Sequence, residues 1–160
     1  LKQLGATTVA STMICAEMTG IKFFVTGGIG GVHKGYEQTL YVSADLEDLG
    51  QTDVTVICAG AKTILDLPRT MEYLETKGVS VVGYQTEVLP AFYTITSDIK
   101  LHLYVDSVED LAKIVFAKEQ LKLKGCLLVA NPIHEKDSLD GDYINDIINR
   151  AVEDSVKDHI

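Results

Sequence analysis

The sequence predicts an α/β protein: a three-layer α/β/α arrangement with a mostly parallel or mixed central sheet. Segments with helical spacing of apolar residues alternate along the chain with short strand-like runs. Those runs are apolar throughout, as strands buried on both faces are. A chain of 160 residues with 46% hydrophobic residues is long enough to bury about two-thirds of its unfolded surface. We therefore expect residues 1–160 to form a single α/β domain.

The first expected elements are a helix and two short strands. Residues 6–19 carry apolar side chains at helical spacing and precede Gly20, a residue type that commonly ends a helix. Residues 21–26 (IKFFVT) combine β-branched and aromatic residues and run directly into a glycine-rich segment, which predicts a buried strand ending in a loop. Residues 54–58 are again apolar and are followed by small residues, so they form the next expected strand.

The rest of the chain continues this alternation. A helix is expected over residues 61–77, because it closes on Lys77 and Gly78, a basic last turn followed by a glycine. The remaining expected elements are strands at 79–84, 99–104 and 126–130 and helices at 108–123 and 143–156. Residues 85–98 (QTEVLPAFYTITSD) form a long aromatic loop, of the kind that often covers a site.

The composition excludes several classes of function. A formal net charge of −9 and a pI near 4.8 argue against a nucleic-acid polymer as partner, because such partners need a basic face. Cys15, Cys58 and Cys126 lie in apolar stretches without C-x-x-C spacing, which favours buried free thiols over disulfides or a zinc site. No apolar run reaches the roughly 18 to 20 residues that span a bilayer, and no signal-peptide pattern is present. We expect a cytoplasmic protein without a membrane partner.

Three segments hold candidate ligand-binding residues, since ligands of open α/β sheets lie outside the carboxyl ends of the strands. The first is TGGIGGVHKG, residues 26–35, whose glycines allow backbone amides to approach an anion and to adopt positive φ. It lacks the P-loop ending and the GxGxxG register, so a phosphate cradle and a simple chain reversal are both open. His33 is open in the same way, between a hydrogen bond to a sugar or phosphate oxygen and a cap of the loop.

The second segment is VSADLEDL, residues 42–49, which places a hydroxyl and a carboxylate near a strand end. Ser43 and Asp45 could bind a ligand there as donor and acceptor. Either residue could instead cap the short acidic helix that follows, which is the simpler interpretation of the same pattern.

The third segment is VICAGAKTILDL, residues 56–67, which places Lys62 between a buried strand and a helix. We expect Lys62 in the first turn of that helix, where desolvation and the helix dipole both disfavour the charged ammonium. A partly neutral lysine can attack a sugar C1 carbonyl carbon and form an imine. The alternative is an ordinary surface pair between Lys62 and Asp66, four residues further along the same helix.

In this order, the blocks of the chain resemble the pseudouridine-5′-phosphate glycosidase family, which is related to indigoidine synthase A-like proteins. The strings that carry the resemblance are GATTVASTM, VTGGIGGVHKG, SADLEDL, VTVICAGAKTILDL, YLETKGVSVVGYQT with PAFY, and LLVANPI. The resemblance extends from Gly5 to about residue 150. Because Leu1 opens the chain without a methionine, we expect residues 1–160 to be the central part of a longer family chain.

The resemblance implies roles for the residues that match the family's motifs. Lys62 matches the nucleophile that forms a Schiff base with C1 of the ribose 5-phosphate moiety. The residues that match substrate contacts come from the SAD, GATTV and glycine-rich blocks: Ser43, Ala44, Asp45, Val9, Thr8, Thr26 and His33. The family's acidic proton donor belongs to a segment before Leu1, and neither Glu17 nor Glu37 matches its motif.

The resemblance also implies a divalent metal, Mn²⁺, held by an aspartate two residues before the serine of the SAD block. This chain has Tyr41 at that position. A neutral phenol is a poor ligand for a hard divalent cation compared with a carboxylate. The manganese that the resemblance implies is therefore not expected at Tyr41.

The implied reaction is the reversible cleavage of the C–C glycosidic bond of pseudouridine 5′-phosphate to uracil and ribose 5-phosphate. An imine suits this reaction, because the leaving group has no glycosidic nitrogen or oxygen that a general acid could protonate. Two alternatives stay open: an impaired or truncated homologue that only binds a phosphosugar, and a class I aldolase-like Schiff-base enzyme. The resemblance further implies a homo-oligomer, specifically a trimer.

Overall fold

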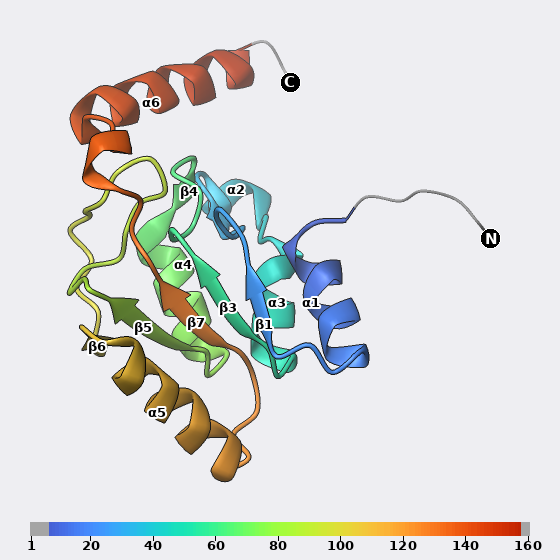
Figure 1. Cartoon of the computed structure of the whole chain (residues 1–160). Helices are drawn as coiled ribbons and strands as arrows, with labels where there is room; N and C mark the ends of the chain where they lie inside the picture. The colour runs from blue at the N-terminus through green and yellow to red at the C-terminus, as the bar shows by residue number, and fades with distance from the viewer. Residues whose placement is uncertain (1–6, 158–160) are drawn as a thin grey trace, which may run out of the picture.

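The central feature of the computed structural model, which describes residues 7–157, is a five-stranded parallel sheet (Figure 1). Its strands lie in the order β1-β3-β7-β5-β6. They are β1 (Phe23–Val25), β3 (Thr55–Cys58), β7 (Leu127–Ala130), β5 (Ser80–Tyr84) and β6 (Tyr104–Val105). Val56 of β3 is in register with Phe24 of β1 and Leu128 of β7, so the carboxyl ends of these three strands meet at one edge of the sheet.

Helices cover both faces of the sheet, as the sequence predicts. The helices α1 (Val9–Met18), α3 (Ala44–Gln51) and α4 (Leu67–Thr76) pack on one face, and α5 (Val108–Gln120) packs on the other (Figure 1). The prediction of a three-layer α/β/α architecture with a mostly parallel sheet is confirmed.

Side chains of the central strands alternate between the two layers of helices. Val56 and Leu128 belong to the core beneath α1, α3 and α4, whereas Ile57 and Val129 pack toward α5. Val56 is fully buried and Leu128 is 1% exposed. Burial of a side chain of this size contributes roughly 1.5 to 3 kcal/mol to the stability of the folded chain. The buried side chains of β3 and β7 therefore fix the positions of the carboxyl ends of these two strands.

Two helices end in the same glycine-dependent motif. Gly20 after α1 and Gly78 after α4 have φ values of 76° and 72°, respectively. In each case the next amide donates back into the last turn, Ile21 to the Ala16 carbonyl and Val79 to the Leu74 carbonyl. The predicted helix stops at both glycines are confirmed, because these bonds satisfy carbonyls that the helix leaves free.

Smaller elements lie around the carboxyl ends of the strands. A two-stranded antiparallel ribbon joins β2 (Val32–His33) to β4 (Leu65–Asp66). The remaining elements are the short helix α2 (Tyr36–Thr39), the 3₁₀ turn η1 (Glu135–Asp137) and the helix α6 (Gly141–Lys157). Figure 1 shows α6 lying beyond the carboxyl ends of the strands. Within the described part of the chain, no helix is both long and apolar enough to cross a bilayer.

Two predicted strands differ from the structure. The strand predicted as buried at 21–26 is the edge strand β1, and the side chains of Phe23 and Val25 are 57% and 70% exposed. An apolar run does not reveal whether a neighbour covers it, which explains this error. The strand predicted at 99–104 is reduced to β6, because the chain before Tyr104 pairs with the loop only through an isolated bridge between Val88 and Lys100.

Candidate active site

The glycine-rich loop lies between the two other candidate segments and is bonded to both. The Ile29 amide donates to the Gly60 carbonyl at 3.1 Å, and the Lys62 amide donates back to the Ile29 carbonyl at 3.1 Å. On the other side, the Ser43 amide donates to the Gly31 carbonyl at 3.0 Å. The three segments that the sequence singled out are therefore neighbours at the carboxyl ends of β1 and β3.

Asp45 joins this group of loops to α1. Its Oδ1 accepts a hydrogen bond from the Ala10 amide at 3.0 Å, and its Oδ2 accepts one from the Gly30 amide at 2.8 Å. Asp45 is only 6% exposed. Because Ala10 lies in the first turn of α1, the carboxylate also faces the positive end of that helix. Both oxygens of Asp45 are thus engaged by the backbone of this chain.

Ser43 caps the helix that begins at Ala44, which was one of the two interpretations of the SAD block. Its hydroxyl accepts a hydrogen bond from the Asp45 amide at 3.3 Å, and its backbone is extended. Ala44 itself is exposed at the start of the helix. The capping interpretation is confirmed for Ser43, and the substrate contacts predicted for these residues stay predictions.

The glycines of the loop serve close packing within the chain. A Cβ on Gly30 would lie 2.1 Å from Ser43 Oγ, and one on Gly31 would lie 2.5 Å from Thr70 Oγ1. The positive φ expected in this segment occurs at Gly35, at 77°. Since the Gly30 amide already donates to Asp45, that amide is not free to hold a phosphate. These contacts favour the packing interpretation of the glycine pattern over the phosphate cradle.

The position predicted for Lys62 is wrong. The helix begins at Leu67, five residues later, and Lys62 lies with an exposed side chain in the turn that leads to β4. Asp66 and Pro68 set this start: Asp66 accepts a hydrogen bond from the Arg69 amide at 3.1 Å as the N-cap, and Pro68 occupies the first turn. Burial and a helix N-terminus, the two grounds for expecting a destabilised ammonium, are both missing at Lys62 in the described chain.

The alternative role of Lys62, as a helical partner of Asp66, is also wrong. The two residues do not share a helix, because Asp66 precedes the first residue of α4. The Asp66 carboxylate instead pairs with the Arg69 guanidinium at 3.0 Å.

The remaining predicted residues lie around these loops. Thr8 is exposed at the N-cap of α1, where its carbonyl accepts a bond from the Thr12 amide at 3.0 Å, and Val9 is 7% exposed. Thr26 and His33 lie at opposite ends of the glycine loop. Thr26 lines a cavity at the strand ends, and the His33 ring packs edge-on against the Tyr41 ring with centroids 4.6 Å apart.

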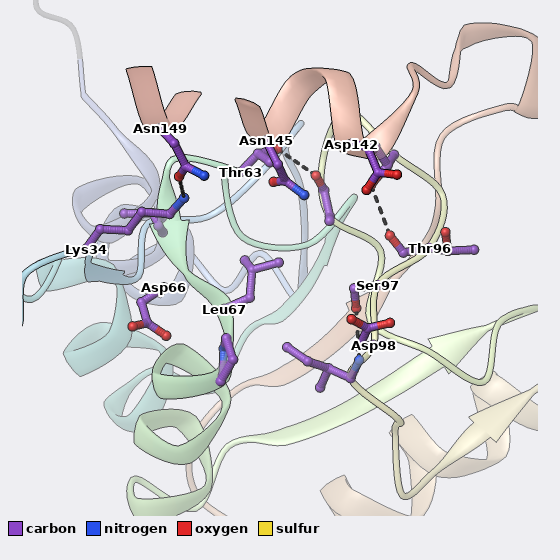
Figure 2. Close-up of a pocket in the computed structure, with 16 residues that line it drawn as sticks. Lys34, Thr63, Asp66, Leu67, Thr96, Ser97, Asp98, Asp142, Asn145 and Asn149 are labelled. Carbon is purple, nitrogen blue, oxygen red and sulfur yellow. Dashed lines mark hydrogen bonds between the residues drawn. The ribbon is translucent and has the colours of Figure 1, made fainter. Parts of the chain in front are cut away.

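Two cavities adjoin the loops. A cavity of about 420 Å³ opens at the carboxyl ends of β1, β3 and β7, and its lining includes Thr26, Phe92, Tyr93 and Asn131. A second cavity of about 720 Å³ lies below α6 (Figure 2). Its lining side chains include three carboxylates, Asp66, Asp98 and Asp142, and one cation, Lys34.

The electrostatics of the two cavities differ. In the larger one, the lining cation Lys34 donates to Asn149 Oδ1 at 3.0 Å (Figure 2). With Asp66 paired to Arg69, the carboxylates of Asp98 and Asp142 still outnumber the Lys34 ammonium in this lining, which disfavours a phosphate group. The smaller cavity combines the rings of Phe92 and Tyr93 with the Thr26 and Tyr93 hydroxyls, the Asn131 amide and one carboxylate, Asp137, a lining that suits a small planar ligand with hydrogen-bonding groups.

The residues around Tyr41 do not fit a hard divalent cation. Tyr41 is 61% exposed, and the neighbouring His33 would add one imidazole to a phenol, whereas Mn²⁺ prefers carboxylate oxygens. Over residues 7–157 no group of three or more His, Cys, Asp or Glu side chains has the arrangement of a metal site.

Sequence reasoning missed two residues of this region. The Thr63 hydroxyl donates to the Ala91 carbonyl at 2.6 Å, and the Phe92 amide donates to the Ala59 carbonyl at 3.0 Å. Both bonds tie the aromatic loop to the segment that carries Lys62. The sequence signalled the loop through its length and aromatic content, but nothing in it pointed to its docking site.

The fold and the site define a class of α/β protein in which a glycine-rich loop, a serine-capped acidic turn and an exposed lysine converge at the strand ends. The chain belongs to the indigoidine synthase A-like protein family, whose sequence model matches residues 1–160. The predicted family resemblance is confirmed.

Individual relatives agree with this assignment. The pseudouridine-5′-phosphate glycosidase of Staphylococcus aureus is 64% identical over 152 residues, which are 95% of this chain and 50% of that protein. That of Glaesserella parasuis is 61% identical over 154 residues, 96% of this chain and 51% of that protein. The chain thus spans about half the length of the curated relatives it matches.

Two solved structures share the fold. The prealnumycin C-glycosynthase AlnA, in complex with ribulose 5-phosphate, superposes with a TM-score of 0.91 at 41% identity over 98% of this chain and 51% of that one. An indigoidine synthase A-like protein from Thermotoga maritima gives a TM-score of 0.83 at 32% identity, over 89% of this chain and 47% of that one.

Proposed function

We propose that this chain is the part of a pseudouridine-5′-phosphate glycosidase that contains the Schiff-base lysine, Lys62. The enzyme reversibly cleaves the C–C glycosidic bond of pseudouridine 5′-phosphate to uracil and ribose 5-phosphate. The observation that carries the proposal is the convergence of the glycine loop, the SAD block and the Lys62 segment at one edge of the sheet. Relatives that are 61% and 64% identical bear the name of this enzyme.

The chemistry needs a lysine that reaches C1 of the sugar. The Lys62 Nζ attacks C1 and displaces the ring oxygen of the ribose, which gives a secondary amine at C1. The uracil carbon bonded to C1 then takes up a proton, the C–C bond breaks with its electron pair passing to the uracil ring, and the nitrogen lone pair closes the C1=N imine. Water then hydrolyses the imine and releases ribose 5-phosphate and the free lysine. The long side chain of Lys62, exposed beside the glycine loop, has the reach for this step.

The relative AlnA supports the link between this fold and C–C bonds to sugars. It is a C-glycosynthase, and its structure holds ribulose 5-phosphate, a pentose phosphate. For the present chain we propose that a pentose 5-phosphate binds beside Thr8, Val9 and Ser43, and that uracil enters the cavity lined by Thr26 and Phe92. The alternatives of a binding-only homologue and of an aldolase-like enzyme have no observation of their own in this structure.

The proton donor is not assigned to either of the two glutamates considered in the sequence. Glu37 accepts a hydrogen bond from its own backbone amide and another from Arg69, and both lower the pKa of its carboxyl, which makes it a poor proton donor at neutral pH. Glu17 accepts a bond from the Asp53 amide at 2.7 Å, at the other end of α1 from the site. We propose that the acid belongs to the part of the family sequence that this chain does not span.

Location and assembly are further parts of the proposal. We propose a cytoplasmic homotrimer that acts without Mn²⁺ at Tyr41. Cys58 and Cys126 are free and buried as predicted, and burial raises their pKa values to about 11 and about 12, whereas Cys15 is exposed, against the prediction of burial. Free thiols of this kind are consistent with a reducing compartment.

A trapping experiment tests the proposed function. The protein is incubated with ribose 5-phosphate and sodium cyanoborohydride, which reduces the imine to a stable secondary amine, and the adduct is located by peptide mass spectrometry. We expect the adduct on Lys62, and its absence or its location on another lysine would contradict the proposal. Formation of pseudouridine 5′-phosphate from ribose 5-phosphate and uracil, measured with the full-length protein, separates this enzyme from an aldolase-like one.

A further inference from the structure

The segment Pro90–Tyr93 of the aromatic loop lies directly against the residues on either side of Lys62. Thr63, which is 6% exposed, donates its hydroxyl to the Ala91 carbonyl at 2.6 Å. Before Lys62, the Ala59 carbonyl accepts the Phe92 amide at 3.0 Å. The two loops are therefore joined by one bond on each side of the lysine.

Gly60 allows these two loops to touch. It has a φ of 93°, and a Cβ at this position would lie 2.0 Å from the Pro90 carbonyl oxygen. Any other residue would be strained there and would push the two backbones apart. Gly60, two residues before Lys62, therefore makes the close contact between the two loops possible.

Phe92 shows that the aromatic loop is held under strain. Its φ is 65°, and the Tyr93 amide donates to the Ala91 carbonyl at 2.8 Å, which closes a three-residue turn around Phe92. Such a turn with positive φ is rare and strained for a residue with a bulky side chain. Its ring lies so close to Gly28 that a Cβ there would be 2.5 Å from it. Strain of this kind persists only where surrounding contacts over-determine the conformation, and it is typical of functional sites.

We propose that Thr63 is a positioning residue for the Schiff-base reaction, because its hydrogen bond to Ala91 fixes the backbone from which the Lys62 side chain extends. The proposal rests on the function proposed above, in which Lys62 is the nucleophile. Lys62 has an exposed and flexible side chain, so its approach to C1 is controlled mainly through its backbone. That backbone is held by the Lys62 amide bonded to Ile29 at 3.1 Å and, one residue later, by the Thr63 hydroxyl.

Thr63 is proposed to affect where the Lys62 nitrogen lies relative to C1, and it takes no part in forming the C–N bond. The amine nitrogen attacks the C1 aldehyde carbon, water leaves with the carbonyl oxygen, and cyanoborohydride delivers hydride to the imine carbon to give a secondary amine. Attack requires the nitrogen to lie roughly 3 to 3.5 Å from C1, and a displacement of about 1 Å can cost about 100-fold in rate. A loosened Lys62 loop should therefore lower the maximal rate of adduct formation more than it changes the ribose 5-phosphate concentration needed for half of that rate.

Matched variants separate the hydroxyl from general packing. Thr63→Val keeps the shape and removes the donor, whereas Thr63→Ser keeps the donor and removes a methyl group. Thr52→Val is the control, because Thr52 is 3% exposed and donates to the Asp48 carbonyl at 2.7 Å, outside the site. We expect the maximal trapping rate to fall by about 10-fold to 100-fold in Thr63→Val, and to stay within about threefold of wild type in the other two.

Hydrogen exchange gives a readout that does not depend on the reaction. In Thr63→Val the amides of Phe92 and Lys62 should exchange faster than in wild type, because both belong to the joined loops. In Thr52→Val they should not change. If Thr63→Val does not fold, Phe92→Gly is used instead. Glycine adopts the positive φ of this position without strain, so the substitution removes mainly the contact between the Phe92 ring and Gly28. It should also lower the maximal trapping rate.

The outcomes are distinguishable. Adduct formation on Lys62 in wild type together with a wild-type rate in Thr63→Val overturns the positioning role and leaves the proposed function intact. A Thr63→Ser variant as slow as Thr63→Val overturns it as well, since the hydroxyl would then be irrelevant, and so does unchanged exchange of the Phe92 amide. Absence of any adduct in the wild-type protein overturns the proposed function, and the positioning role with it.

Discussion

The replacement of Asp45 by asparagine tests whether this carboxylate holds the site together. Asp45 accepts two backbone amides, from Ala10 at 3.0 Å and from Gly30 at 2.8 Å, and it is 6% exposed. An asparagine keeps one acceptor oxygen and turns an NH₂ donor toward the other amide. One charge-assisted bond is lost and one buried N–H is left unpaired, each worth about 1 to 3 kcal/mol. We expect Asp45→Asn to lower the free energy of unfolding by about 3 kcal/mol.

Urea unfolding followed by circular dichroism measures this effect. With a urea m-value of about 2 kcal/mol per molar, a loss of about 3 kcal/mol moves the midpoint by about 1.5 M. Asp48→Asn is the matched control on the same helix. Burial, and then the charges of Asp45 and Glu47, raise the pKa of the Asp48 carboxyl, so an amide there should leave stability unchanged or slightly higher. Equal midpoints for Asp45→Asn and Asp48→Asn would refute the reasoning. The sequence suggests a ligand or substrate contact for Asp45, whereas its hydrogen bonds predict that its loss also lowers stability.

Three other predictions follow from the site and its surroundings. Lys62→Ala should abolish the ribose 5-phosphate adduct and leave the unfolding free energy within about 0.5 kcal/mol of wild type, because the side chain is exposed; a retained adduct would contradict the assignment. Tyr41→Asp should make the trapping rate sensitive to EDTA, and an unaltered response would show that this position does not control metal binding. Hydrogen bonds from Lys77, and then from Tyr73, lower the pKa of the Glu47 carboxyl from 4.5. The ionised carboxylate therefore stabilises the folded protein above pH 4.5, and this contribution is lost as the pH falls through the lowered pKa of the folded state. The difference in melting temperature between wild type and Glu47→Gln should accordingly shrink below pH 4.5, and a constant difference would count against the pairing.

The parts of the fold that the sequence predicted well are those that depend on local patterns. The apolar runs that became β3 and β7 are buried on both faces, so their composition alone identifies them as central strands. The ends of α1 and α4 were predictable because Gly20 and Gly78 adopt a left-handed conformation that other residues avoid.

The errors arose where one local signal competed with another or where the partner was distant in sequence. The helix after β3 was placed too early because apolar spacing outweighed the cap signal of Asp66 and Pro68, which marks the true start. The bond between Asp45 and Ala10 joins residues 35 positions apart, and no periodicity reports such a contact. The candidate residues were thus predictable from motifs, but their partners were not.

Asp45 also has a consequence for how the pocket responds to substrate. One buried carboxylate on α3 accepts hydrogen bonds from the start of α1 and from the glycine loop, so these three segments are fixed to one another in the folded chain. This arrangement belongs to the folded chain itself, so the sugar phosphate of the proposed function would meet segments that are already in contact. Such preorganisation leaves more of the binding free energy for the reacting geometry, since little of it is consumed in ordering the protein.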